Sequence, residues 1–324
     1  MLFQSEEDIR ILHMQRLCTD KESDSPTPLL SCAARYPNGA SFSHTVGGER
    51  DISLCAESVR HTVLASVSVL LSAIGAWSLS TSISEILPQF PMKAVTLYDL
   101  LCGTLPIKIK SRLCDDSDID ALFRHIEICK EKTPICTYQI QDRLLTALIE
   151  HISDMPIDEI CELALFAPLG MRSTFFLTGD REKIRLPYHV ETNTEEDLNE
   201  AKGKLFSTAD DLFILLSALS DAMHGKHTPV FTQKNASILF TPQKDSLYTP
   251  AFLMRGDIRN TPFFPDAASS TSFLSLRESN AFLFCDLTYG VSFAVLSENT
   301  LLSRDRNTVA RLGNVFLNAE NEKI

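Results

Sequence analysis

Glycine is scarce in this chain: only 12 of its 324 residues are glycine, about 4% where roughly 7% is usual. Positions at which a ligand can approach the backbone closely are therefore few. Basic residues are also in the minority, with 30 Lys and Arg against 42 Asp and Glu and a formal net charge of −12. Nucleic-acid binding needs clustered Lys and Arg that displace counterions from phosphates, so we expect no nucleic-acid partner.

Features of secreted, metal-binding and membrane proteins are missing as well. The nine cysteines form an odd set without a C-x-x-C pair, which predicts reduced, mostly buried thiols and no zinc site. Acidic residues stand near the N-terminus where a signal peptide needs basic ones, so we expect a cytoplasmic location. The uncharged run over residues 62–84 contains seven serines, and we expect it to form a buried helix and not a membrane span. Nothing in the sequence calls for a cofactor.

Hydrophobic periodicity places strands at both ends of the chain and helices in the middle. Pro37-Asn38-Gly39 lies between two strand-like runs, 29–36 and 40–46, and predicts a hairpin because Asn and Gly tolerate a positive φ. Short strand-like runs follow Pro262. They cover 271–276, 281–287 and 291–296, and a final helix is expected over 307–317. Helical patterns cover 59–77, 116–130, 141–152, 157–166 and 210–222, the last one opening with a capping sequence at Ser207-Thr208.

These elements predict an α/β (α+β) protein of a single domain, 1–324. Its antiparallel sheet is built from both chain ends and flanked by helices, with a mostly helical lobe inserted between them. We assign 1–58 and 262–324 to the sheet lobe and 59–261 to the helical lobe.

Several ordered strings resemble the serine β-lactamase and penicillin-binding-protein superfamily, on its class C and esterase-like side. Pro168-Leu169-Gly170-Met171 with Thr174 is similar to its P-L-G-M-x-x-T string. Residues 203–212 (GKLFSTADDL) are very close to its G-x-L-F-S-T-A-D-D-L stretch. Residues 83–91 and 96–101 match segments around its helical lobe. The resemblance implies the β-lactamase/transpeptidase-like fold over about residues 29–317.

The resemblance also implies a Ser-x-x-Lys motif, in which serine is acylated and lysine takes its proton. The matching residues are Ser58-Val59-Arg60-His61, so Ser58 is the candidate nucleophile. His61 is the candidate base because a neutral imidazole accepts a proton near pH 7, while Arg60 points elsewhere on the helix. Taken without the family, Ser58 is the kind of residue that caps a helix N-terminus.

The family's Tyr-x-Asn element matches Tyr138-Gln139-Ile140. Tyr138 would shuttle a proton, and the missing asparagine amide would be replaced only if Gln139 reaches the site. Read by itself, Tyr138 is a half-buried aromatic residue at the start of a helix.

The family's Lys/His-x-Gly triplet lines the site from a strand. Anchored on Ser270-Thr271-Ser272-Phe273, the matching triplet is Pro265-Asp266-Ala267. We expect Asp266 and Ala267 to face the substrate and the N–H of Ala268 to donate to an oxyanion, as the N–H of Ser58 does. All three functional features of the triplet have changed.

Two interpretations follow. The first, which we favour, is a β-lactamase-related protein with a degenerate site that has become a binding module with little or no activity, because catalytic groups that act as a unit fail together. The second is a working serine hydrolase, an esterase or amidase or a β-lactam or peptide acyl transferase, with a Ser58 acyl-enzyme. Either could take a small ester, amide or peptidoglycan-like ligand, and the sequence specifies no protein partner.

Overall fold

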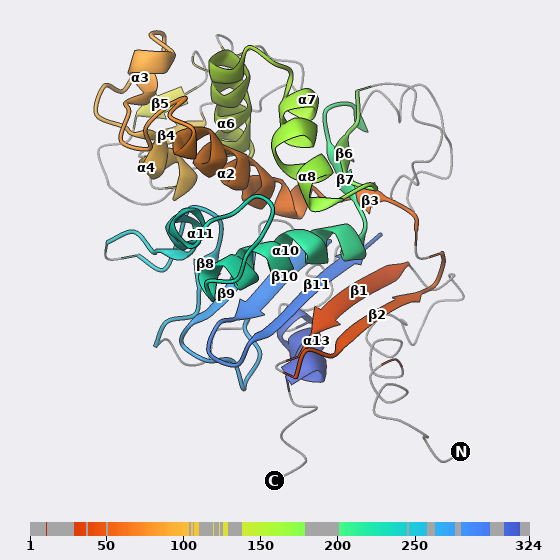
Figure 1. Cartoon of the computed structure of the whole chain (residues 1–324). Coiled ribbons are helices and arrows are strands. Elements are labelled where there is room, and N and C mark those ends of the chain that lie inside the picture. Colours follow the sequence, from red (N-terminus) through yellow and green to blue (C-terminus); the bar gives the residue numbers. More distant parts are fainter. Residues whose placement is uncertain are drawn as a thin grey trace, which may run out of the picture.

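The computed structural model describes most of the chain (Figure 1). The described residues are 11, 29–36, 38–49, 51–103, 105, 107–109, 119, 123, 126–128, 138–178, 201–244, 246–257, 263–275, 280–298 and 308–317.

An antiparallel six-stranded sheet takes strands from both ends of the sequence, in the order β2-β1-β11-β10-β9-β8 (Figure 1). The strands are β1 (Leu30–Arg35), β2 (Ser41–Val46), β8 (Leu253–Met254), β9 (Ser272–Ser275), β10 (Ala281–Asp286) and β11 (Val291–Ser297). The pairing of β1 with β11 joins the two ends. This arrangement confirms the predicted fold class.

The predicted hairpin joins β1 to β2. Gly39 has a φ of 83°, a left-handed conformation that glycine adopts without strain. The Tyr36 N–H donates to the Ala40 carbonyl across the turn, and Leu30 to Arg35 pair with Val46 to Ser41.

Alternate residues of β10 point to opposite faces of the sheet, and both faces are covered. Phe282 and Phe284 pack in the cluster that includes Phe316 of α13 (Thr308–Leu317). Leu283 and Cys285 belong to the larger core, which contains the buried leucines of α10 (Ala209–Met223). The sheet is thus a middle layer between α13 and α10 (Figure 1).

The first part of the uncharged run, residues 62–73, lies in the expected buried helix. This is α2 (Glu57–Ala73), and 12 of its 17 residues are buried. The helix ends before Ile74, which is 79% exposed. Around α2 lie further helices and short strands. They are α3 (Ile83–Ile86), α4 (Leu97–Leu101), α6 (Tyr138–Ser153), α7 (Ile157–Cys161), a π-helical turn (Glu162–Phe166), α8 (Ala167–Leu169), α11 (Gln233–Phe240), β3 (Leu54–Cys55), β6 (Phe175–Phe176) and β7 (Leu205–Ser207). No helix within the described ranges is long and apolar enough to cross a membrane.

One predicted helix is wrong at its C-terminal end. The pattern over 116–130 predicted a helix, and Ile119 and Phe123 are helical. Further on, however, β5 (Ile126–Ile128) pairs antiparallel with β4 (Ile107–Ile109). Each strand alternates isoleucine with a charged residue, and this period-2 pattern favours a strand.

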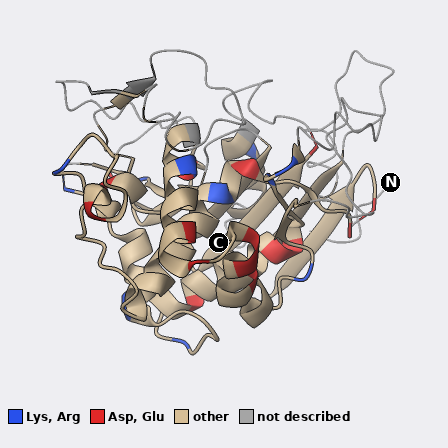
Figure 2. Ribbon diagram, turned by 90° about the horizontal axis from the view of Figure 1, so that it is seen from above, with Lys and Arg blue, Asp and Glu red and all other residues tan. Residues whose placement is uncertain are grey.

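The sheet layer takes in parts of the 59–261 range that we assigned to the helical lobe. Helix α10 packs on β1, β10 and β11, and β8 is the strand at one edge of the sheet. Helix α10 begins where predicted, because the side chain of Thr208 accepts a hydrogen bond from the Asp211 N–H. In the view of Figure 2, Lys and Arg residues are scattered over the described ribbon and do not gather into a stripe.

Candidate functional site

The N-terminal end of α2 is fixed by strand β7. The Ala56 N–H donates to the Leu205 carbonyl at 2.8 Å, and the Leu205 N–H donates to Glu57 Oε1 at 2.6 Å. Ala56 is the residue that precedes the helix. Ser58 therefore lies inside the first turn and is not the N-cap serine that its residue type suggested.

The hydroxyl of Ser58 is bound at the start of strand β10. Ser58 has no exposed surface, and its Oγ donates to Asn280 Oδ1 at 2.5 Å. The same oxygen accepts from the N–H groups of Asn280 at 3.4 Å and Ala281 at 3.3 Å. Asn280 is itself oriented, because its Nδ2 donates to the Cys55 carbonyl at 2.5 Å. The asparagine amide oxygen accepts a hydrogen bond from the hydroxyl but does not deprotonate it, because an amide is not a base at neutral pH.

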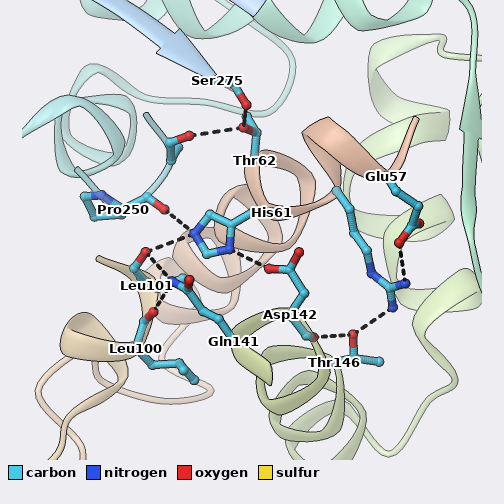
Figure 3. Close-up of polar contacts among 12 residues, drawn as sticks. Glu57, His61, Thr62, Leu100, Leu101, Gln141, Asp142, Thr146, Pro250 and Ser275 are labelled. Carbon is cyan, nitrogen blue, oxygen red and sulfur yellow. Dashed lines mark hydrogen bonds and ion pairs between the residues drawn. The ribbon is translucent and has the colours of Figure 1, made fainter. Parts of the chain in front are cut away.

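His61 lies one helical turn after Ser58, but its ring is bound elsewhere (Figure 3). Nδ1 lies 2.7 Å from Asp142 Oδ1, and Nε2 lies 2.9 Å from the carbonyl oxygens of Leu101 and Pro250. Because carbonyl oxygens only accept, Nε2 carries a proton. Nδ1 and the Asp142 carboxylate share a second proton, so neither nitrogen offers a lone pair to Ser58.

The polar network continues into the helical layer and the sheet. Thr62 Oγ1 donates to the Ala251 carbonyl at 3.1 Å and lies 2.6 Å from Ser275 Oγ of β9. Gln141 Nε2 donates to the carbonyl oxygens of Leu100 and Leu101 at the end of α4. These side chains are buried, so each bond replaces one that water would make in an open cleft.

Asp142 and Asn280 are the two polar partners that our sequence reasoning missed. Asp142 carried a weak signal, because it stands at the start of the helix predicted over 141–152, directly after the Tyr138-Gln139-Ile140 string. Asn280 carried none, since an asparagine before a strand is ordinary turn chemistry.

Arg60 points away from Ser58, as expected from its position on the helix. Its guanidinium donates to Glu57, to the Gly203 carbonyl and to Thr146 Oγ1. It also lies over the ring of Phe176, 5.2 Å from the centroid. This cation is used to hold α2 against its neighbours.

Tyr138 and Gln139 are the first two residues of α6, and their side chains lie outside the described part of the chain. Ile140, at the family's asparagine position, is fully buried among apolar residues. The roles expected of Tyr138 and Gln139 therefore stay predictions.

The structure does not bring Asp266, Ala267 and Ala268 to Ser58. Ser58 contacts Ala281 at the start of β10, whereas Ser272 pairs with Asp286 at its other end, about 17 Å along the strand. Residues 265–268 precede Ser272 on that far side. Asp266 bonds the side chain of Asn314 in α13, and Ala268 packs in the α13 cluster. Anchoring the triplet on Ser270-Thr271 placed it at the wrong end of the sheet.

Most of the described cysteines are buried: Cys32, Cys102, Cys161 and Cys285 are buried, and Cys55 is partly exposed. Burial raises the pKa of the Cys161 and Cys285 thiols far above the usual range, so these two stay protonated and are not nucleophiles. No group of three or more His, Cys, Asp or Glu within the described ranges could hold a metal ion.

Comparisons with known proteins agree with this fold. The family model described as Beta-lactamase matches residues 58–311. A class C β-lactamase from Rhodobacter sphaeroides superposes with a TM-score of 0.73 at 16% identity, covering 97% of this chain and 99% of its own. The D-amino acid amidase of Ochrobactrum anthropi SV3, complexed with D-phenylalanine, superposes with a TM-score of 0.69 at 17% identity, covering 96% and 100%. EstCE1, a hydrolase with promiscuous acyltransferase activity, gives a TM-score of 0.73 at 12% identity and covers 96% and 98%. No curated protein sequence matches the chain.

Proposed function

The chain belongs to the β-lactamase family. We propose that it is a member in which the side chains at the acyl-transfer positions make structural hydrogen bonds, and that it acts as a non-catalytic binding module. The observation that carries this proposal is that Ser58 and His61 of the Ser-x-x-His motif have separate hydrogen-bond partners. Ser58 is bound to Asn280 and Ala281, while His61 is bound to Asp142, Leu101 and Pro250.

Acylation of a serine requires a base within hydrogen-bonding distance of its Oγ. The hydrogen-bond partners of Ser58 in the described chain are an amide oxygen and two N–H groups, and none of them takes a proton. The hydroxyl also has no solvent-exposed surface, so an acyl donor would first have to displace β10 or its neighbours. Both facts support an idle nucleophile.

For the ligand of the binding module we propose a small ester-, amide- or peptidoglycan-like molecule. The amidase relative was crystallised with D-phenylalanine, and its fold covers almost all of this chain. A test is a thermal-shift series with D-phenylalanine amide, a penicillin and a neutral sugar as the control. We expect a rise in melting temperature with an amide ligand and none with the sugar.

A working serine hydrolase is the alternative, and one observation favours it. Two backbone N–H groups, those of Asn280 and Ala281, point at Ser58 Oγ, and converging N–H groups are what an oxyanion site uses. In this structure they serve the hydroxyl itself.

Intact mass after incubation with a fluorophosphonate, and separately with a penicillin, separates the two functions. We expect no adduct on the wild-type chain, with Ser58→Ala as the background and a class C β-lactamase as the positive control for the reagents. A stoichiometric adduct on the wild type that disappears in Ser58→Ala would overturn the proposal in favour of the hydrolase. Hydrolysis of a short-chain p-nitrophenyl ester by the same two samples gives an independent readout.

A further inference from the structure

The ring of His61 joins α2 to three other parts of the chain. Nδ1 binds Asp142 in α6. Nε2 binds the carbonyl oxygens of Leu101, the last residue of α4, and of Pro250, three residues before β8. Figure 3 shows the ring between these groups. A side chain that is 1% exposed and binds three elements has few alternative positions.

Residues Thr249–Phe252, here called the Pro250 strap, form a turn whose N–H groups are satisfied within it. Thr249 Oγ1 accepts from the N–H groups of Ala251 at 3.3 Å and Phe252 at 2.8 Å. The ring of Phe252 stacks on Phe240 with centroids 4.8 Å apart. The strap is therefore preformed.

The carbonyl groups of the strap are bound by α2. His61 Nε2 donates to the Pro250 oxygen and Thr62 Oγ1 donates to the Ala251 oxygen. These consecutive side chains of α2 thus bind consecutive carbonyl groups of the strap.

The C-terminal end of α4 is held in the same way. The last carbonyl groups of a helix have no partner within the helix. Here the Leu101 oxygen accepts from His61 and from Gln141, and the Leu100 oxygen also accepts from Gln141. Donors from α2 and α6 together cap α4.

We propose that His61 is an interlock that keeps the Pro250 strap and the end of α4 closed on α2, and that Asp142 is the positioning residue that orients its ring. This inference rests on the proposed function, since a histidine that served Ser58 as a base would have to release these carbonyl groups. Histidine in place of the motif's lysine thereby provides the N–H group that binds the Leu101 and Pro250 carbonyl oxygens.

Hydrogen exchange by mass spectrometry on the full chain tests the interlock. Replacing His61 by leucine leaves the Pro250 oxygen without the N–H donor that binds it, and buried acceptors without donors favour local opening. In His61→Leu we expect exchange at least about tenfold faster in peptides covering 247–254 and 97–103, with β10 and β11 unchanged. The matched control is His151→Leu, an exposed histidine on α6, which should leave both peptides unchanged.

Two milder variants decide the matter if His61→Leu fails to fold. Asp142→Asn keeps an oxygen that accepts from Nδ1, so we expect smaller accelerations in both peptides. Thr62→Val keeps the side-chain shape and removes only the bond to the Ala251 oxygen and the contact with Ser275, so the strap peptide should speed up while the α4 peptide does not.

Unchanged exchange in the strap peptide of Asp142→Asn would overturn the interlock, as would equal acceleration in β10 and β11. The exchange experiment uses no reactive probe, so it is independent of the adduct test. A labelled wild-type Ser58 overturns the proposed function, whereas an unaffected strap overturns the interlock.

Discussion

The two ends of strand β10 both bury polar groups, but they satisfy them differently. At the far end Asp286, which is 1% exposed, accepts hydrogen bonds from the N–H and Oγ of Ser269 and from Ser272 Oγ. It also accepts from the N–H groups of Thr288 and Tyr289. All these donors lie within 17 positions of Asp286.

At the end of β10 that binds Ser58, the polar groups come from segments far apart in the sequence. Ser58 and Asn280 are 222 positions apart, and His61 and Asp142 are 81 apart. The Asp286 end is therefore a self-contained corner of the sheet, whereas the Ser58 end exists only when several elements have packed together. Substitutions at the Ser58 end should loosen packing between elements, and those at the Asp286 end should affect one corner.

The largest effect is expected for Asp142→Ala. It leaves the buried Nδ1 of His61 without its hydrogen-bond partner, and an unsatisfied buried polar group of this kind costs about 3 kcal/mol in the free energy of unfolding. Urea unfolding monitored by circular dichroism measures it, with Asp142→Asn as the size-matched control that should lose less. If Asp142→Ala lowered the free energy of unfolding less than Asp286→Ala does, the difference between the two ends of β10 would be contradicted.

Asp286→Ala should cost less, about 2 kcal/mol. Its five donors lose their acceptor, but Thr288 and Tyr289 lie at a partly exposed turn, where water replaces some of the bonds. The same urea titration tests this. Hydrogen exchange should show faster exchange near 269–272 and 288–290 with the Pro250 strap unaffected, and spread of the effect to the strap would break the distinction between the two ends.

The pair of Arg35 and Asp221 tests whether a large separation in the sequence is enough to make a substitution strongly destabilising. Arg35 of β1 donates two hydrogen bonds of 2.9 Å to Asp221 of α10, 186 positions away, and Lys226 donates a third at 3.0 Å. Burial raises the pKa of Asp221, but the hydrogen bonds and charges of Arg35 and Lys226 outweigh it and hold the pKa below its usual value.

Because this site is partly exposed, we expect Asp221→Asn to lower the free energy of unfolding by only about 0.5 kcal/mol at pH 7. A carboxyl with a lowered pKa in the folded state stabilises it above the unfolded pKa of about 4, and this contribution is lost as pH falls through the folded value. Thermal unfolding of both proteins from pH 7 downwards should therefore converge in acid. A difference that persists below both pKa values would rule out the linkage.

Much of the fold was predictable because its signals are local. The alternation in 281–287 and 291–296, the turn at Asn38-Gly39 and the capping sequence before α10 each act over a few residues, and the structure confirms all three. The predicted helix at 116–130 is helical at Ile119 and Phe123 but wrong at Ile126–Ile128. Short apolar runs do not distinguish a helix from a ribbon whose partner, here Ile107–Ile109, lies elsewhere in the sequence.

In the candidate site, too, local features were predictable from the sequence and long-range contacts were not. By itself the sequence determined that Ser58 and His61 stand one turn apart on a buried helix, because helical spacing is fixed by local hydrogen bonding. Only the tertiary structure decided that Ser58 binds Asn280, that His61 binds Asp142 and Pro250, and that Asp266 lies against α13. A hydrogen bond forms only when its two atoms lie within about 3 Å of each other. For residues 48 to 222 positions apart, that distance is set by how the layers pack.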